Sequence, residues 1–333
     1  MLILNDKQVK ELLTESLCRE TMASVMKAVS KGEAIQPMRQ MIRQPSGPGM
    51  MGWMPGYIGP QEKGAPGALG MKLMSIFPQV GAQGRSHHRG VCTLFNHDTG
   101  EVDALIEAGS ITSIRTPCAT AVATQALART DSNTLAILGT GEQASGHLSA
   151  LLDLFLFDRV LVWGHSKGSS ERFAAHWSDL KGVRIETATS VEQAVAEADI
   201  VCTTTAAAEP ILRYEWLKSG AHVNVIGSSV PFTSEIDIDL VSRSRFFVDH
   251  RETVQVQGGD YRRALEAGAI DNSHIEAEVG EVLLGQHSGR TSDQEITVYK
   301  SVGLVGYDLA AAQAVYNEAR NKQLGQIISL VNE

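Results

Sequence analysis

The feature that most constrains the fold is a glycine-rich turn, GTGEQA at residues 139–144. A short apolar run, TLAIL at 134–138, precedes it, and a helical pattern, HLSALLDLF at 147–155, follows. Between a strand and a helix, the spacing G-x-G-x-x-A is typical of a turn that binds a dinucleotide. The glycines allow a tight turn and close approach of a pyrophosphate to the helix N-terminus. A tight turn without ligand is the alternative, but this context favours nucleotide binding.

The chain after residue 119 continues this alternation of strands and helices. Candidate strands occur at 135–138, 160–164, 183–187, 199–205, 222–227 and 245–249. Helical patterns lie between most of them, which predicts an α/β domain with a Rossmann-type doubly wound parallel sheet.

The N-terminal part has a different pattern. Residues 2–4 read as a strand, and apolar positions from Val9 to Val29 recur at helical spacing. Alternation in 90–96 and 101–106 predicts a β-hairpin. We therefore expect a second, α+β domain with an antiparallel-leaning sheet. The final helix, predicted over 306–325, is expected to leave the Rossmann domain and pack on this part.

Composition narrows the class of protein. The 333 residues carry a net charge of −9, which gives no support to nucleic-acid binding. The four cysteines are scattered, which predicts free thiols in a reducing compartment. The sequence contains no uninterrupted apolar run of membrane-spanning length, and the N-terminus lacks a signal-peptide layout. We expect a cytoplasmic protein without a membrane partner. No metal-binding spacing of Cys or His occurs, so we expect no metal.

Two strand ends bear on the cofactor. In NAD enzymes an acidic residue about 20 positions after the glycines binds the ribose. Here His165, Ser166 and Lys167 follow the strand at 160–164, with no carboxylate. These side chains suit a 2′-phosphate, which favours NADPH over NADH, although a solvated loop is the alternative. Thr203, Thr204 and Thr205 close another strand, where their hydroxyls either contact the ribose or pyrophosphate or merely fill the strand end.

Three cations of the N-terminal part, Arg39, Lys72 and Arg115, lie in apolar surroundings. A buried charge needs a partner, and an anionic substrate is one, because arginine binds a carboxylate bidentately. For any one of them alone, a structural salt bridge or an exposed strand face is the simpler interpretation.

These and other residues together resemble the ornithine cyclodeaminase/mu-crystallin family, over essentially the whole chain. The matching motifs are Gln36-Pro37-Met38-Arg39, Met54-Pro55, Gly70-Met71-Lys72, Arg115-Thr116 with its Ala-rich helix, the turn at 139–144, and Ser301-Val302-Gly303 with Asp308 and Ala311-Ala312.

The resemblance implies a homodimer of chains with two domains. Residues 1–118 with 306–333 would form the substrate and dimerisation domain, and 119–305 the dinucleotide domain. Arg39, Lys72 and Arg115 would gather around a substrate carboxylate next to the nicotinamide. The cofactor-binding residues expected are Arg115, Thr116, Gly139, Thr140, Gly141, Glu142, Gln143, Ala144, His165, Ser166, Lys167, Thr203, Thr204, Thr205, Ser301 and Gly303.

Two departures from the family pattern bear on the reaction. Cyclodeaminases of the family have carboxylates at the positions that Gly52 and Ser229 occupy here. Cyclodeamination needs groups that move protons, whereas a reductase needs an oriented imine and a proton. The motif pattern is therefore closest to the ketimine reductases. It implies NAD(P)H-dependent reduction of Δ1-pyrroline-2-carboxylate or Δ1-piperideine-2-carboxylate to L-proline or L-pipecolate.

In this hypothesis Lys72 is the catalytic residue: it either binds the carboxylate or helps to protonate the imine. Ser229 would orient a water or the ring nitrogen. Three alternatives remain: an ornithine cyclodeaminase that recycles NAD+, an amino acid dehydrogenase resembling alanine dehydrogenase, and an NADPH-regulated protein that binds a small ligand without catalysis.

Overall fold

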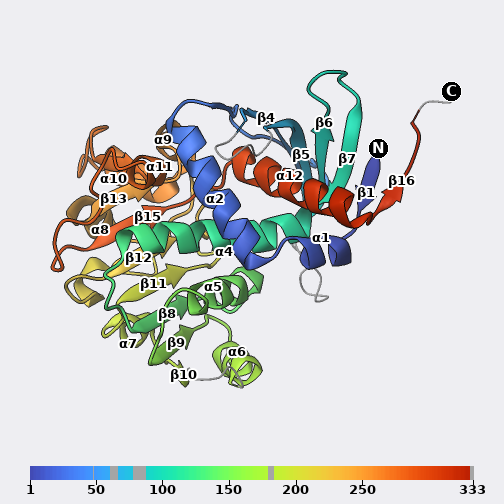
Figure 1. Ribbon diagram of the computed structural model, residues 1–333. Helices are drawn as coiled ribbons and strands as arrows, with labels where there is room; N and C mark the ends of the chain where they lie inside the picture. The colour runs from blue at the N-terminus through green and yellow to red at the C-terminus, as the bar shows by residue number, and fades with distance from the viewer. Residues whose placement is uncertain (48, 61–66, 78–87, 179–183, 331–333) are drawn as a thin grey trace. The chain divides into compact units, whose positions relative to one another are not determined.

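The computed structural model describes residues 1–47, 49–60, 67–77, 88–178 and 184–330 (Figure 1). The chain forms two compact units. Unit 1 comprises Met1–Ala119 and Leu304–Glu333, and unit 2 comprises Thr120–Gly303.

Unit 2 is built on one sheet of eight strands in the order β10-β9-β8-β11-β12-β15-β13-β14, all parallel. This confirms the predicted doubly wound parallel sheet. Each candidate strand of the sequence analysis corresponds to a strand of this sheet, whereas β14 and β15 were not predicted. The strands are β8 (Thr134–Leu138), β9 (Arg159–Trp163), β10 (Arg184–Thr187), β11 (Ile200–Thr203), β12 (His222–Val225), β13 (Arg245–Val248), β14 (Ile275–Glu278) and β15 (Thr297–Lys300).

Helices cover both faces of this sheet, and alternate strand residues supply the two cores. Leu135 and Ile137 of β8 point into one core, with α5 and α6, whereas Ala136 and Leu138 point into the other, with α7, α8 and α10. The helices of unit 2 are α5 (Glu142–Leu152), α6 (Ser169–Trp177), α7 (Val191–Val195), the 3-10 helix η2 (Tyr214–Trp216), α8 (Ile238–Arg243), α9 (Arg251–Gln257), α10 (Gly259–Glu266) and α11 (Val279–Leu283).

Unit 1 contains the second sheet, in the order β16-β1-β7-β6-β5-β4-β2, with β3 paired to β4. Its pairs are antiparallel except β1 with β7, and β6 with β7 is the predicted hairpin. The strands are β1 (Leu2–Leu4), β2 (Ala34–Ile35), β3 (Gln40–Arg43), β4 (Met50–Ile58), β5 (Ala68–Ile76), β6 (His88–Phe95), β7 (Val102–Glu107) and β16 (Gln326–Ile327).

The helical spacing from Val9 to Val29 continues without interruption, but the structure divides this segment into two helices. These are α1 (Asp6–Leu12) and α2 (Glu15–Ser30). Thr14 lies between them, and its hydroxyl accepts a hydrogen bond from the Leu17 N–H at 3.3 Å. This N-cap begins a new helix without changing the apolar spacing, so periodicity alone does not reveal the break.

Two longer helices complete the description of unit 1. Helix α4 (Ala108–Leu127) begins before Pro117 and not after it, and its C-terminal part continues into unit 2. Helix α12 (Val305–Lys322) packs against α2 and lies on β4 and β5 (Figure 1). The strand residues under it include Gly56 and Gly70, where a Cβ would crowd the side chains of Val305 and Leu309. Side-chain-free positions therefore let the helix approach the sheet closely.

Candidate functional site

Unit 1 contains a buried cluster of two cations and one carboxylate. Lys72 Nζ lies 2.9 Å from Asp308 Oδ1, and Arg115 Nε lies 2.9 Å from the same oxygen. Lys72 also donates to Thr112 Oγ1 at 2.6 Å. The exposed fractions are 3% for Lys72, 6% for Arg115 and 0% for Asp308. Among the described residues, Asp308 is the carboxylate that pairs with both cations, so the cluster carries one excess positive charge.

Three elements bring these side chains together. Lys72 projects from the middle of β5, Arg115 from α4, and Asp308 from the first turn of α12. Burial alone would raise the pKa of Asp308, but Arg115 and Lys72 outweigh it and hold that pKa below the usual value of 3.8. The carboxyl group is therefore ionised at neutral pH.

The cluster refines the prediction for the three cations. Lys72 and Arg115 do form the salt bridge that was the simpler interpretation, with a partner that the sequence analysis had not assigned to them. The one excess positive charge of the cluster can still be compensated by a second anion. Arg39 is half-buried in the segment between β2 and β3, and its role in substrate binding stays a prediction.

In unit 2 the glycine turn has the geometry of a phosphate-binding turn. Gly139 has φ +123°, and a Cβ there would collide with Thr204, so glycine is required. Gly141 is the N-cap of α5 and has no side-chain cap; a Cβ at Gly141 would meet no described atom within 4 Å. The N-cap position of α5 is therefore open, which fits the approach of a pyrophosphate to the helix N-terminus.

The other predicted cofactor residues of unit 2 lie at the same edge of the sheet, because the carboxyl ends of parallel strands share one edge. They follow β8 (Gly139, Thr140, Gly141, Glu142, Gln143, Ala144), β9 (His165, Ser166, Lys167), β11 (Thr204 and Thr205, after Thr203 at the strand end) and β15 (Ser301, Gly303). Ser229, predicted to bind substrate, follows β12 and is half-buried. The roles of these residues, and those of Arg115 and Thr116 on α4, stay predictions.

The threonine hydroxyls at the end of β11 are engaged inside the protein. Thr203 Oγ1 and Thr205 Oγ1 each donate to Glu235 at 2.7 Å, and Thr204 Oγ1 donates to the Leu138 carbonyl at 3.1 Å. Glu235 also accepts from the Gly227 N–H at 2.7 Å, and it is buried, which raises its pKa. The strand-end role is therefore observed for these hydroxyls, and toward a ligand they retain acceptor capacity only.

Asp249, which the sequence analysis missed, holds the turn after β15. One of its oxygens accepts from Ser301 Oγ at 3.1 Å and from the N–H groups of Val302 at 2.8 Å and Gly303 at 2.9 Å. Gly303 has φ +76°, the left-handed conformation that closes the turn. Burial raises the pKa of Asp249, although these donors favour its ionised form. The turn is thus positioned by a residue at the end of β13.

A second buried ion pair fixes the loop that carries Ser229. Lys300, the last residue of β15, lies 2.7 Å from Asp260 Oδ2 and donates to the Ser228 carbonyl. Both charged side chains are 0% exposed. Asp260 in turn accepts from the N–H groups of Glu235 and Ile236. The loop is therefore anchored to the sheet.

The loop after β9 is different, because His165, Ser166 and Lys167 are all exposed. The His165 ring makes an edge contact with Trp163, with centroids 6.4 Å apart. No carboxylate occupies the end of β9, as the sequence indicated. This arrangement suits a 2′-phosphate, and it is equally that of a solvated loop.

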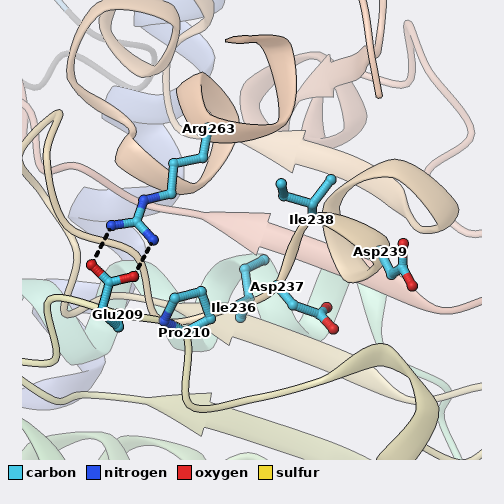
Figure 2. A pocket seen from close by; sticks show the side chains of 7 residues that line it. All are labelled: Glu209, Pro210, Ile236, Asp237, Ile238, Asp239 and Arg263. Carbon is cyan, nitrogen blue, oxygen red and sulfur yellow. Dashed lines mark hydrogen bonds and ion pairs between the residues drawn. The ribbon is translucent and has the colours of Figure 1, made fainter. Parts of the chain in front are cut away.

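A hollow of about 430 Å³ lies elsewhere in unit 2, and Figure 2 shows the side chains that line it. Its lining residues are Glu209, Pro210, Ile236, Asp237, Ile238, Asp239 and Arg263. The carboxylate of Glu209 pairs with Arg263 at 2.7 Å on one side, and two further carboxylates line the hollow. None of the predicted site residues lines it, and its acidic lining does not suit an anionic ligand.

Two further findings concern the described residues. No group of His, Cys, Asp or Glu among them is arranged to hold a metal ion. In the same part of the chain, no helix is both long and apolar enough to cross a membrane.

Known proteins resemble this chain along its length. A Δ1-pyrroline-2-carboxylate reductase of Bacillus cereus is 30% identical over 329 residues, covering 98% of this chain and 99% of that protein. The structure of Thermococcus litoralis Δ1-pyrroline-2-carboxylate reductase, in complex with NADH and L-proline, has a TM-score of 0.92, 31% identity, and coverage of 98% of this chain and 100% of its own.

An archaeal alanine dehydrogenase dimer with bound NAD has a TM-score of 0.91 and 27% identity, and the match covers 99% of each chain. The profile of the ornithine cyclodeaminase/mu-crystallin family matches residues 1–323. The chain therefore belongs to the ornithine cyclodeaminase/mu-crystallin family.

Proposed function

We propose that this protein reduces a cyclic imino acid with NAD(P)H, converting Δ1-pyrroline-2-carboxylate or Δ1-piperideine-2-carboxylate to L-proline or L-pipecolate. The observation that carries this proposal is the excess positive charge of the Lys72–Arg115–Asp308 cluster, which suits one substrate carboxylate. The glycine turn and strand ends of unit 2 supply the dinucleotide site. The reductases of Bacillus cereus and Thermococcus litoralis support the reaction type.

In the proposed mechanism, Arg115 and Lys72 bind the substrate carboxylate, with Arg39 as a further ligand. Asp308 and Thr112 engage two of the three Nζ protons of Lys72, and no other described residue accepts the third, which a ligand would accept in this proposal. From that position Lys72 either binds the carboxylate or protonates the imine nitrogen, which makes the carbon a better hydride acceptor. A bound nicotinamide supplies the hydride. Most of the catalysis is then positioning and charge complementarity.

For the dinucleotide we propose NADPH over NADH. The supporting observation is the exposed Ser166 and Lys167 at the end of β9, where NAD enzymes carry an acidic residue. The Thermococcus structure contains NADH and the archaeal dehydrogenase NAD, so NADH is the competing assignment. The ratio of kcat/KM with NADPH and NADH tests this directly, and Lys167→Ala should lower it.

We also propose a homodimer formed through the sheet of unit 1. Five apolar side chains lie on the face opposite to Lys72, each more than a third exposed: Ile35, Ile42, Met51, Leu69 and Leu73. A contiguous exposed apolar face marks an interface, and the archaeal relative is a dimer. Leu73→Glu should yield monomers in sedimentation analysis. Leu156→Glu, at a site 93% exposed in unit 2, is the control that should not.

For localisation we propose the cytoplasm, because all four cysteines are free and buried, as expected in a reducing compartment.

The deciding experiment follows NADPH and NADH oxidation with Δ1-pyrroline-2-carboxylate. Two parallel assays test the alternatives: L-ornithine with NAD+, and pyruvate with ammonium and NADH. Rapid oxidation with the cyclic imino acid alone supports the proposal. Proline formed from ornithine would identify a cyclodeaminase, and ammonium-dependent turnover of pyruvate would identify an alanine dehydrogenase.

A further inference from the structure

The face of the unit 1 sheet that carries Lys72 becomes apolar on one side of the ion cluster. Lys72 pairs with Met54 of β4, and two positions further along, Met74 pairs with Gly52. Gly52 also pairs with Met41 of β3. Residues two apart on a strand, and residues directly paired across strands, share a face. Met41, Gly52 and Met74 therefore lie on the face of Lys72.

Methionine side chains fill the space above Gly52. A Cβ at Gly52 would collide with Met41 Sδ and would lie 3.1 Å from Met74 Cε. Met74 is 5% exposed, whereas Met41 is 39% exposed, so Met41 is the part of this surface that a ligand can reach. We call Met41, Gly52 and Met74 the methionine wall.

The spacing between the wall and the ion cluster suits a small ring. Two strand residues span about 7 Å, so the wall begins about that far from Lys72 along β5. A five- or six-membered ring whose carboxylate is bound at Lys72 would place its far methylene groups against thioether side chains. Thioethers are polarizable and apolar, and they offer no partner to an ammonium group.

We propose that the methionine wall is the specificity determinant of this site: it packs against the ring methylenes and selects substrates whose part remote from the carboxylate is uncharged. This inference rests on the function proposed above and adds to it the residues that discriminate between substrates. It assigns to Met41, which no motif of the sequence singled out, the contact with the ring.

The test compares Met41→Ala, Met41→Glu and the volume-matched control Met41→Leu. Ligand binding is measured with two carboxylates, L-proline and acetate, by inhibition of turnover and by thermal shift. Acetate has no ring, so the ratio of the two dissociation constants isolates the ring contact from the ion cluster and from changes in folding.

We expect Met41→Ala to weaken L-proline binding, and to raise KM for the cyclic imino acid, by about tenfold, as for a lost methylene contact. Acetate binding and the KM for dinucleotide should stay within about twofold in Met41→Ala. Met41→Leu should retain most of the L-proline affinity, because it keeps the apolar volume. Met41→Glu should lose L-proline affinity further and bind L-ornithine more tightly than the wild type, because it adds an anion for the ω-ammonium group.

An unchanged ratio of the L-proline and acetate dissociation constants in both Met41→Ala and Met41→Glu would overturn the inference. Equal losses of affinity for the two ligands would give this result. This result is distinguishable from failure of the proposed function. If the wild type reduced no cyclic imino acid, the reductase proposal would fall, whereas the binding ratio would still report on the wall.

Discussion

Replacing Asp308 by asparagine tests the charge balance of the ion cluster. In the wild type one carboxylate compensates two buried cations, with both N–O distances 2.9 Å. Asp308→Asn keeps the size of the side chain but leaves Lys72 and Arg115 as two unpaired buried charges. Breaking a buried pair by removing one partner costs about 3–5 kcal/mol. We expect a loss at the upper end of this range, because one change removes both interactions.

Lys72→Met is the matched comparison, because it leaves Arg115 and Asp308 as a neutral pair. Its free energy of unfolding should fall by only about 1–2 kcal/mol, mainly from the lost hydrogen bond to Thr112. In the double variant, Lys72→Met should relieve part of the Asp308→Asn loss, since one unpaired cation remains instead of two. The coupling free energy of the cycle should thus be about 1–3 kcal/mol.

The assay is urea unfolding at pH 7, with hydrogen exchange of the β5 and α12 amides to localise the effect in unit 1. A loss below about 1 kcal/mol for Asp308→Asn, or equal losses for the two single variants, would refute the charge-balance reasoning. L-Proline should raise the transition midpoint of the wild type and not that of Lys72→Met, because the latter has no excess charge for a carboxylate.

Four further outcomes are expected. Lys72→Ala should lose turnover while dinucleotide binding, measured by fluorescence titration, is retained; an unchanged rate would remove Lys72 from the mechanism. Gly141→Ala should fold normally, since its Cβ meets no described atom within 4 Å, yet weaken dinucleotide binding at least tenfold by obstructing the phosphate, roughly a 1.4 kcal/mol effect. Asp249→Asn should raise the KM for dinucleotide, because it loosens the turn after β15; an unchanged KM, or a loss of thermal stability alone, would argue against this positioning role. Burial lowers the pKa of His147 to about 4 and that of His222 to about 3. The unfolded chain, with a histidine pKa near 6.5, therefore binds more protons than the folded chain below that pH. The free energy of unfolding should be fully retained above pH 6.5 and fall by roughly 2 kcal/mol per histidine by pH 5. Urea unfolding at a series of pH values measures this, and a flat profile between pH 7 and 5 would contradict the prediction.

Most strands of the unit 2 sheet were predictable because they are short apolar runs, a local pattern that needs no information from distant parts of the chain. Strand β15 was missed because its four residues, Thr297–Lys300, end in a lysine, which reads as exposed. In the structure Lys300 is fully buried and paired with Asp260. A buried charge is stable only through its partner, and the partner lies 40 positions away in the sequence.

The candidate site, like the sheet, was predictable where the sequence pattern is local and not where it depends on distant residues. The glycine turn is a local pattern, so sequence was enough to find it. The pairing of Lys72 with Asp308 joins residues 236 positions apart, and Glu235 collects donors from the end of a neighbouring strand. Such contacts depend on how strands and helices are brought together, and a single sequence carries no direct record of that. The acidic residues that organise both parts of the site were therefore missed as partners, although the residues they hold were predicted.

The residue at position 52 affects both the charge of the ion cluster and the polarity of the surface beside it. An acidic side chain there, as in the cyclodeaminases that the sequence resembles, would project from the same sheet face as Lys72 and would have to displace the Met41 and Met74 side chains. It would bring a second negative charge to a cluster that has two positive ones, and so compensate the charge now left for a substrate carboxylate. With Gly52, the cluster keeps its excess charge and the neighbouring surface stays apolar. These two properties together suit a substrate with an anionic end and uncharged methylene groups remote from it, which is the combination that a cyclic imino acid presents.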